Sequence, residues 1–173
     1  MIGSFDRDKP LHVRQVHTAE VCGVTFSKDG SQVISSSSDG DLIVWNRAKG
    51  TRVSFLFGHT SHVYRCVCSP DGKTVASVSH DKTVRLWPLS PGGRKAVLEG
   101  HRDPVYAVAF SSDGKRLLSA GDDRVIREWK AGTDKPTREM KGHANTVYAV
   151  AISPDGKLIA SAGTSGRIRL WRE

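Results

Sequence analysis

The chain has 173 residues, of which 38% are hydrophobic and 25% are charged, and its formal net charge is +8. This composition is typical of a soluble domain with a real core. No apolar run approaches the roughly 20 residues of a membrane span, and the first ten residues hold no apolar signal stretch. Three cysteines without a CxxC pair predict neither a zinc site nor a disulfide framework. We therefore expect a reducing, cytoplasmic location.

Residues 1–9 are polar, and we expect them to be frayed. Residues 10–17 match in position the segments that precede His59, His101 and His143, so we expect the same structure there. The segments that follow, VCGVTFS, SQVISSS and DLIVW, are short, rich in β-branched residues and separated by Asp-Gly turns. This pattern predicts antiparallel strands and hairpins, and no window of eleven residues shows a helical period.

Three markers recur along the chain with the same step of 42 residues. A period of this size indicates one supersecondary unit used repeatedly, each burying its apolar face against its neighbours. The units span residues 10–45, 52–87, 94–129 and 136–171. The markers are Trp45, Trp87, Trp129 and Trp171; His17, His59, His101 and His143; and the Asp-Gly pairs that begin at Asp29, Asp71, Asp113 and Asp155.

The order Gly-His, strand, Pro-Asp-Gly, strand, Ser-x-x-x-Asp and a strand ending in Trp resembles the WD-repeat β-propeller family. The resemblance covers residues 10–172 in four successive copies. It implies an all-β fold with four blades of four antiparallel strands, in which each repeat supplies three strands of one blade and the fourth strand of its neighbour.

Four blades lie at the lower limit of the ~4–8 that propellers use, so three arrangements stay open. The chain can be an open arc or a fragment of a longer propeller. It can close as a ring in which residues 10–17 supply the missing strand beside the strand that ends at Trp171. Alternatively, two copies can form a homodimer with an eight-bladed ring, which would remove both free sheet edges.

The resemblance also implies a buried hydrogen-bonded set of His, Ser, Asp and Trp in each blade. A buried indole N–H needs an acceptor, and a His between Ser and Asp has its tautomer fixed. In the fourth unit Ser165 replaces the Asp, which should orient His143 less firmly. The sets are His17, Ser35, Asp39 and Trp45; His59, Ser77, Asp81 and Trp87; His101, Ser119, Asp123 and Trp129; and His143, Ser161 and Trp171.

These residue types also form hydrolase triads. However, a set that recurs in every unit, inside a sheet and without a G-x-S-x-G motif, is structural. Two charged residues depart from the repeat: Glu128 and Arg65 stand where the other units have apolar or small residues. We expect both to be paired with opposite charges. We expect Cys66 and Cys68 to fill the core.

The sequence contains no phosphate-binding loop and no HExxH motif, so we expect no enzyme activity, no cofactor and no metal. The resemblance implies a protein-interaction scaffold whose partner docks on the face carrying the loops that precede the first strand of each blade. Tyrosines recur on this face with the repeat and suit an interface. The candidate partner-binding residues are Tyr64, Tyr106, Tyr148, His62, His80 and Asp122.

Two other functions stay open. The chain can be the non-catalytic part of a larger regulatory or enzymatic protein. Alternatively, a basic rim can bind nucleic acid or an acidic partner, although the charges are spread over all repeats, which is more typical of a solvated surface and disfavours nucleic acid. The rim would comprise Arg47, Lys49, Arg52, Arg94, Lys95, Lys130, Lys135, Arg138 and Lys141.

Overall fold

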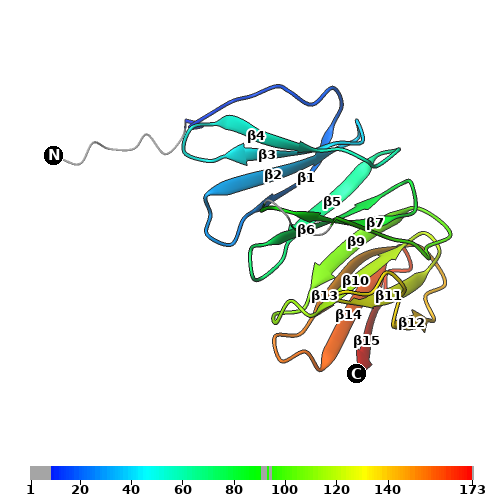
Figure 1. Ribbon diagram of the computed structural model, residues 1–173. Coiled ribbons are helices and arrows are strands. Elements are labelled where there is room, and N and C mark those ends of the chain that lie inside the picture. Colours follow the sequence, from blue (N-terminus) through cyan, green and yellow to red (C-terminus); the bar gives the residue numbers. More distant parts are fainter. Residues whose placement is uncertain (1–8, 91–92, 94, 173) are drawn as a thin grey trace.

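The computed structural model describes residues 9–90, 93 and 95–172, so that the N-terminal residues 1–8 and Arg94 lie outside the described part. The described residues form fifteen strands in four antiparallel sheets and contain no helix. The sheets are arranged side by side like the blades of a fan, and the chain visits them in order (Figure 1). The prediction of an all-β fold built from four sheets is confirmed.

Within each sheet the strands follow the chain order. The first sheet comprises β1 (Val21–Phe26), β2 (Gln32–Ser37), β3 (Leu42–Asn46) and β4 (Thr51–Leu56). The second comprises β5 (Val63–Cys68), β6 (Thr74–Ser79), β7 (Val84–Pro88) and β8 (Ala96–Leu98). The third comprises β9 (Val105–Phe110), β10 (Arg116–Gly121), β11 (Val125–Lys130) and β12 (Arg138–Lys141). The fourth comprises β13 (Val147–Ile152), β14 (Leu158–Gly163) and β15 (Ile168–Arg172).

The Asp-Gly pairs form the turns between the first two strands of each sheet. Gly30 has a φ of 67°, a left-handed conformation that glycine adopts without strain. The preceding Asp29 accepts a hydrogen bond of 2.6 Å from the Ser27 hydroxyl. This bond, together with those from Ser31, lowers the pKa of Asp29 to about 2. The turn is therefore stabilised by its own side chains, and the same arrangement recurs 42 residues later, at Ser69 and Asp71.

The hydrophobic core lies between consecutive sheets. The first two sheets meet where Ile34 and Leu42 pack against Val63, Val75 and Trp87. All five are almost completely buried, with exposed fractions of 0–1%. Equivalent clusters join the second sheet to the third and the third to the fourth. Each interior interface therefore pairs the middle strands of one sheet with the first strands and the Trp of the next, as expected when a repeat buries its apolar face on its neighbour.

Residues 10–17, which we expected to act as a strand, form no strand. They lie against the first sheet, where His12 Nε2 is 3.1 Å from the Ala48 carbonyl oxygen and Arg14 Nε donates to the Gly50 carbonyl oxygen. The described part of the fourth sheet accordingly has three strands. The first and fourth sheets stand at opposite ends of the fan (Figure 1), so residues 10–17 cannot reach β15. The described molecule is an open arc.

Candidate functional site

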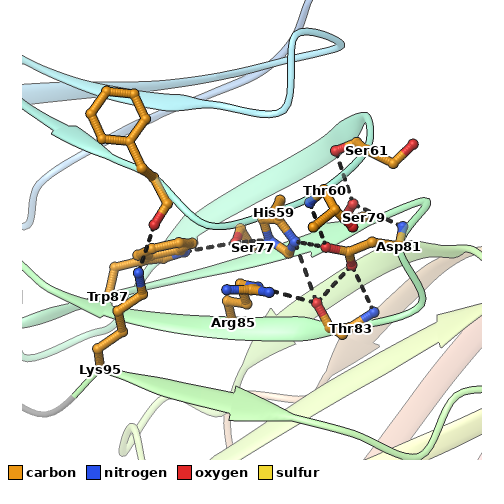
Figure 2. Close-up of polar contacts among 11 residues, drawn as sticks. His59, Thr60, Ser61, Ser77, Ser79, Asp81, Thr83, Arg85, Trp87 and Lys95 are labelled. Atoms are coloured by element: carbon orange, nitrogen blue, oxygen red, sulfur yellow. Dashed lines mark hydrogen bonds and ion pairs between the residues drawn. The ribbon is translucent and has the colours of Figure 1, made fainter.

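The second sheet shows the hydrogen-bonded set most completely (Figure 2). The Trp87 Nε1–H group donates to the Ser77 hydroxyl at 2.7 Å. The Ser77 hydroxyl lies 2.7 Å from His59 Nε2, and His59 Nδ1 lies 2.7 Å from Asp81 Oδ2. Ser77, Trp87 and His59 are at most 8% exposed. The set therefore bridges the loop before β5, strands β6 and β7, and the turn between those two strands.

The chain of donors fixes the tautomer of His59. The Asp81 carboxylate can only accept, so a neutral His59 ring carries its proton on Nδ1 and donates it to Asp81. His59 Nε2 is then the acceptor for the Ser77 hydroxyl, whose oxygen accepts from the Trp87 indole. Burial alone would raise the pKa of Asp81, but the hydrogen bonds from His59 and Thr83 outweigh it and hold this pKa well below its usual value. Burial lowers the pKa of His59, so a neutral ring faces a carboxylate.

The first and third sheets repeat this geometry. In the first sheet Ser35 and Asp39 lie 2.8 and 2.9 Å from His17, and Trp45 donates to Ser35 at 2.9 Å. In the third sheet Ser119 and Asp123 lie 2.7 and 2.9 Å from His101, and Trp129 donates to Ser119 at 2.8 Å.

The fourth sheet has the same set without the carboxylate. Trp171 donates to the Ser161 hydroxyl at 2.8 Å, and this hydroxyl lies 2.7 Å from His143 Nε2. Within the described residues His143 Nδ1 is buried and has no hydrogen-bond partner, because Ser165 stands where the other sheets carry Asp. The ring of His143 is thus held at one nitrogen instead of two.

An arginine that the sequence reasoning missed extends the set in the third sheet. Arg127 is 4% exposed, contacts both Asp123 and His101, and forms an ion pair with Glu139 at 3.1 Å. A signal was available, because Arg85, Arg127 and Arg169 follow one another at 42-residue steps. Repetition of a charged residue at an interior strand position would have indicated a buried partner.

The three tyrosines predicted to bind a partner form a continuous row. Each is the second residue of the first strand of its sheet. The rings of Tyr64 and Tyr106 are 4.8 Å apart between centroids, and those of Tyr106 and Tyr148 are 5.0 Å apart. Burial against these neighbours, with the adjacent phenols and Asp122, raises the pKa of Tyr106 to about 12. Tyr148, at the end of the row, is 48% exposed.

The remaining candidates stand beside this row. The rings of His62 and His80 lie 6.2 and 6.3 Å from that of Tyr64, and 6.1 Å from each other. At the next sheet Asp122 accepts a hydrogen bond from the Thr146 hydroxyl. The structure thus brings all six candidates to one face, with imidazoles at one end of the row and a carboxylate near its middle.

The departures from the repeat have separate outcomes. Glu128 is 5% exposed and lies 3.9 Å from the Arg116 guanidinium, as expected for a paired charge. Arg65 is exposed on β5 rather than buried in a pair. Cys66 is buried, and this burial raises the pKa of its thiol to about 11. Cys68 is half-buried.

Several residues of the proposed basic rim are engaged inside the molecule. Lys95 lies 4.3 Å from the centre of the Trp87 ring (Figure 2) and donates to the Phe57 carbonyl oxygen. Arg52 lies 4.3 Å from the ring of Phe55. Lys141 forms an ion pair with Glu139 at 3.2 Å. These contacts use cationic groups that a continuous anion-binding surface would need to leave free.

No group of three or more His, Cys, Asp or Glu side chains in the described part of the chain could hold a metal ion. The four hydrogen-bonded sets lie in four separate sheets of the described chain. Nor do the described residues contain a helix that could span a membrane.

Four like sheets fanned side by side, each pinned by the same internal hydrogen bonds, define a tandem-repeat protein of the β-propeller class. The family model described as WD domain, G-beta repeat matches residues 8–46, 50–88, 92–130 and 134–172. The chain therefore belongs to the WD-repeat family, whose members are generally interaction scaffolds that bind protein partners.

Among solved structures the chain is similar to one described as the structure of U3-55K. The two share 25% sequence identity with a TM-score of 0.83, over 92% of this chain and 50% of that chain. This chain thus spans about half the length of the matched one. A search of curated proteins gave no match.

Proposed function

We propose that this chain is a non-catalytic scaffold whose protein partner docks on the tyrosine row, Tyr64, Tyr106 and Tyr148. The contiguity of the row carries this proposal. Rings at 4.8 and 5.0 Å form one aromatic strip across three sheets. Separate strand-capping tyrosines need not touch one another. Tyrosine is well suited to an interface because it is large, rigid and able to form hydrogen bonds.

The row also has the surroundings that a binding strip needs. Tyr64 and Tyr106 lie on strands of interior sheets, beside the fully buried Val63 and Val105, so little order has to be gained there on binding. The polar groups around it, His62 and His80 at one end and Asp122 near the middle, can select the direction of a bound segment. We infer a partner that lays an extended segment with apolar and polar side chains along the row.

The test combines affinity capture, identification of what is captured, and a binding measurement on three variants. Replacing the three tyrosines by Ala should weaken binding at least tenfold, whereas replacement by Phe should retain the part contributed by the rings. Lys130→Ala, an exposed change at the end of β11, is the matched control and should leave affinity unchanged. Undiminished binding by a folded triple Ala variant would remove this face from consideration.

We further propose that the ends of the arc are covered by a second copy of the chain, giving a homodimer of eight sheets. Ile168 and Leu170 are 76% and 70% exposed on the fourth sheet, and Val21 is 57% exposed on the first. Val63 and Val105, which occupy the position of Val21 in the two interior sheets, are fully buried. The chain thus exposes both halves of its own inter-sheet interface, one at each end, and two copies could satisfy both ends.

Light scattering on the purified chain tests this arrangement. A mass of about twice 18.8 kDa is expected, and Ile168→Asp should reduce it to that of one chain. Val53→Asp, an exposed change on the outer strand β4, is the control and should leave the dimer intact. A compact monomer at all concentrations would exclude the homodimer. In that case, additional sheets of a longer polypeptide would be the alternative that buries the exposed faces of the first and fourth sheets.

We infer a reducing, cytoplasmic location. All three cysteines are free and Cys22 is exposed, a state that an oxidising compartment would not preserve. Nucleic acid is not favoured as a partner, because Arg52, Lys95 and Lys141 make intramolecular contacts. Retention on heparin that falls steeply with salt would contradict this view.

A further inference from the structure

The first three sheets each use a carboxylate as an acceptor with two working oxygens. In the second sheet Asp81 Oδ2 accepts from His59 Nδ1 and from the main-chain nitrogen of Thr60. Asp81 Oδ1 accepts from the main-chain nitrogen of Thr83 and from its hydroxyl. The first and third sheets repeat the imidazole bond and both main-chain bonds. The position is therefore built around a planar anion with two acceptor atoms.

The fourth sheet keeps the donors and lacks the acceptor. Trp171 donates to Ser161, whose hydroxyl lies 2.7 Å from His143 Nε2. In the tautomer that the carboxylate fixes in the other three sheets, Nδ1 carries the ring proton, and the same tautomer in the fourth sheet makes His143 Nδ1 a donor. His143 is 7% exposed, and within the described residues this Nδ1–H group has no acceptor. A buried donor of this kind requires one.

An arginine faces the same place, and it forms no ion pair with any residue of the described ranges. Arg169 occupies the position of Arg127, which binds Asp123 in the third sheet. Its Nε is buried without a partner in the described part of the chain. The Arg169 guanidinium lies beside the residue before His143, because a Cβ added at Gly142 would stand 3.9 Å from Arg169 Nη1. Burial first, and then the positive charge of Arg169, lower the pKa of His143. A neutral water could accept the His143 proton but would not balance the guanidinium charge.

The turn that carries Ser165 has kept its shape. The residue after it, Gly166, has a φ of 68°, compared with 70° for Lys82 and 63° for Arg124, which follow Asp81 and Asp123. The loss of the carboxylate therefore leaves the local backbone conformation in place. Ala144 and Arg167 occupy the chain positions whose main-chain nitrogens bind the carboxylate in the other sheets.

We propose that the fourth sheet contains a binding site for a carboxylate anion, formed by His143 Nδ1–H and the Arg169 guanidinium, at the position that an Asp side chain occupies in the other three sheets. A carboxylate matches the site better than a halide, because the position is shaped for two acceptor oxygens. The carboxylate can come from a small free anion such as formate or from an acidic side chain of a bound protein.

Thermal unfolding in sodium formate and in sodium chloride tests the site. Ser165→Asp supplies the carboxylate permanently and should raise the unfolding temperature by about 3–10 °C at low salt. General salt effects should change the unfolding temperatures of the unmodified chain and of the Ser165→Asp variant equally. Occupancy of the site is therefore measured by the difference between these two unfolding temperatures. This difference should shrink by at least half as formate rises to saturation, and should persist in chloride. A difference that formate leaves unchanged would refute the site, and equal shrinkage in chloride would refute its selectivity for carboxylates.

The His143 ring proton gives a second reading that does not depend on the Ser165→Asp variant. Its NMR signal should move downfield on titration with formate, while that of His59, already bonded to Asp81, should not. Arg169→Gln should weaken the formate response at least tenfold, and Lys157→Gln, which removes an exposed cation in the turn between β13 and β14, should not. An unresponsive His143 proton would overturn the proposal.

The source of the carboxylate is tested by titrating N-acetylaspartate amide in parallel. A response to this compound as well as to formate would show that an acidic protein side chain can enter, whereas a response to formate alone would identify a small free anion. Either result requires the same two donors. Absence of both responses in the folded chain would rule the site out.

Discussion

Replacing Ser119 by Ala should remove the central link of the hydrogen-bonded set in the third sheet. The Ser119 hydroxyl accepts from Trp129 Nε1 at 2.8 Å and contacts His101 Nε2 at 2.7 Å. Ser119 is completely buried, Trp129 is 1% exposed and His101 is 7% exposed. Ala leaves the indole N–H and the imidazole nitrogen buried and unpaired.

The cost can be worked out from these two groups. A buried polar group that loses its partner costs about 1–3 kcal/mol, so the loss of two predicts a decrease of about 2–6 kcal/mol in the free energy of unfolding. For a chain of this size, each kcal/mol corresponds to roughly 2–4 °C in the unfolding temperature. Urea unfolding followed by Trp fluorescence, together with a thermal scan, measures both quantities.

The matched control is Ser90→Ala, at an exposed position after β7, which should change stability by less than about 0.5 kcal/mol. Ser161→Ala in the fourth sheet should cost less than Ser119→Ala, because Trp171 is only half-buried and His143 is already unpaired at Nδ1. If Ser119→Ala were no more damaging than Ser90→Ala, the buried set would contribute no net stability.

Three further outcomes are expected. Gly121→Ala should destabilise the chain by about 1–3 kcal/mol in urea unfolding, because the added carbon would stand 2.0 Å from the Pro104 carbonyl oxygen; unchanged stability would show that the loop yields freely. Cys66 should react with a thiol reagent at least 100-fold more slowly than exposed Cys22, since burial raises the pKa of the Cys66 thiol to about 11; equal rates would indicate that the sheets open. The free energy of unfolding should fall as the pH is lowered from 7 to 4. Burial lowers the pKa of His59 in the folded state. Burial alone would raise the pKa of Asp81, but its hydrogen bonds hold this pKa low. The unfolded chain therefore binds more protons than the folded chain, first below about pH 6.5 through His59 and then near pH 4 through Asp81. A flat pH profile would contradict this linkage.

The sequence predicted the individual sheets well because each is specified locally. Segments rich in strand-forming residues alternate with Asp-Gly turns, and this pattern recurs in four repeats at a step of 42 residues. The prediction that residues 10–17 form a strand was wrong. Repeat spacing shows that this segment is equivalent to the outer strands of the other units, but it does not show whether a neighbouring sheet is present to pair with it. Strand pairing is a property of two segments, and β15 lies at the far end of the arc (Figure 1).

The residues of the proposed interaction surface could be selected from the sequence, but their mutual contact could not. Tyr64, Tyr106 and Tyr148 are 42 residues apart along the chain, and the 4.8 and 5.0 Å between their rings depends on how tightly consecutive sheets pack. The recurrence of Arg85, Arg127 and Arg169 at 42-residue steps indicates a buried partner, but identifying that partner as Asp123 required the structure. The unpaired Nδ1 of His143 could be predicted only in part. The sequence shows Ser165 where the other sheets have Asp, whereas the proximity of Arg169 required the structure.

The fourth sheet should be the least stable part of the arc, and Tyr148, at one end of the proposed interaction surface, belongs to it. In a repeat protein stability is the sum of each unit and its contacts with neighbours. The described fourth sheet has three strands, one covered face and no carboxylate in its hydrogen-bonded set. Strands β9 and β13 share the sequence VYAVA, so their amide exchange rates compare almost identical chemistry in two settings.

We expect the amides of β13 and β14 to exchange at least tenfold faster than those of β9 and β10, as measured by hydrogen exchange with NMR or mass spectrometry. Ser165→Asp should reduce this difference by supplying the missing acceptor. Since Tyr148 belongs to β13, a partner that uses the whole tyrosine row must also order this sheet, and bound partner should slow the same amides. Equal protection of the third and fourth sheets in the free chain would show that the missing strand, cover and carboxylate carry no energetic penalty.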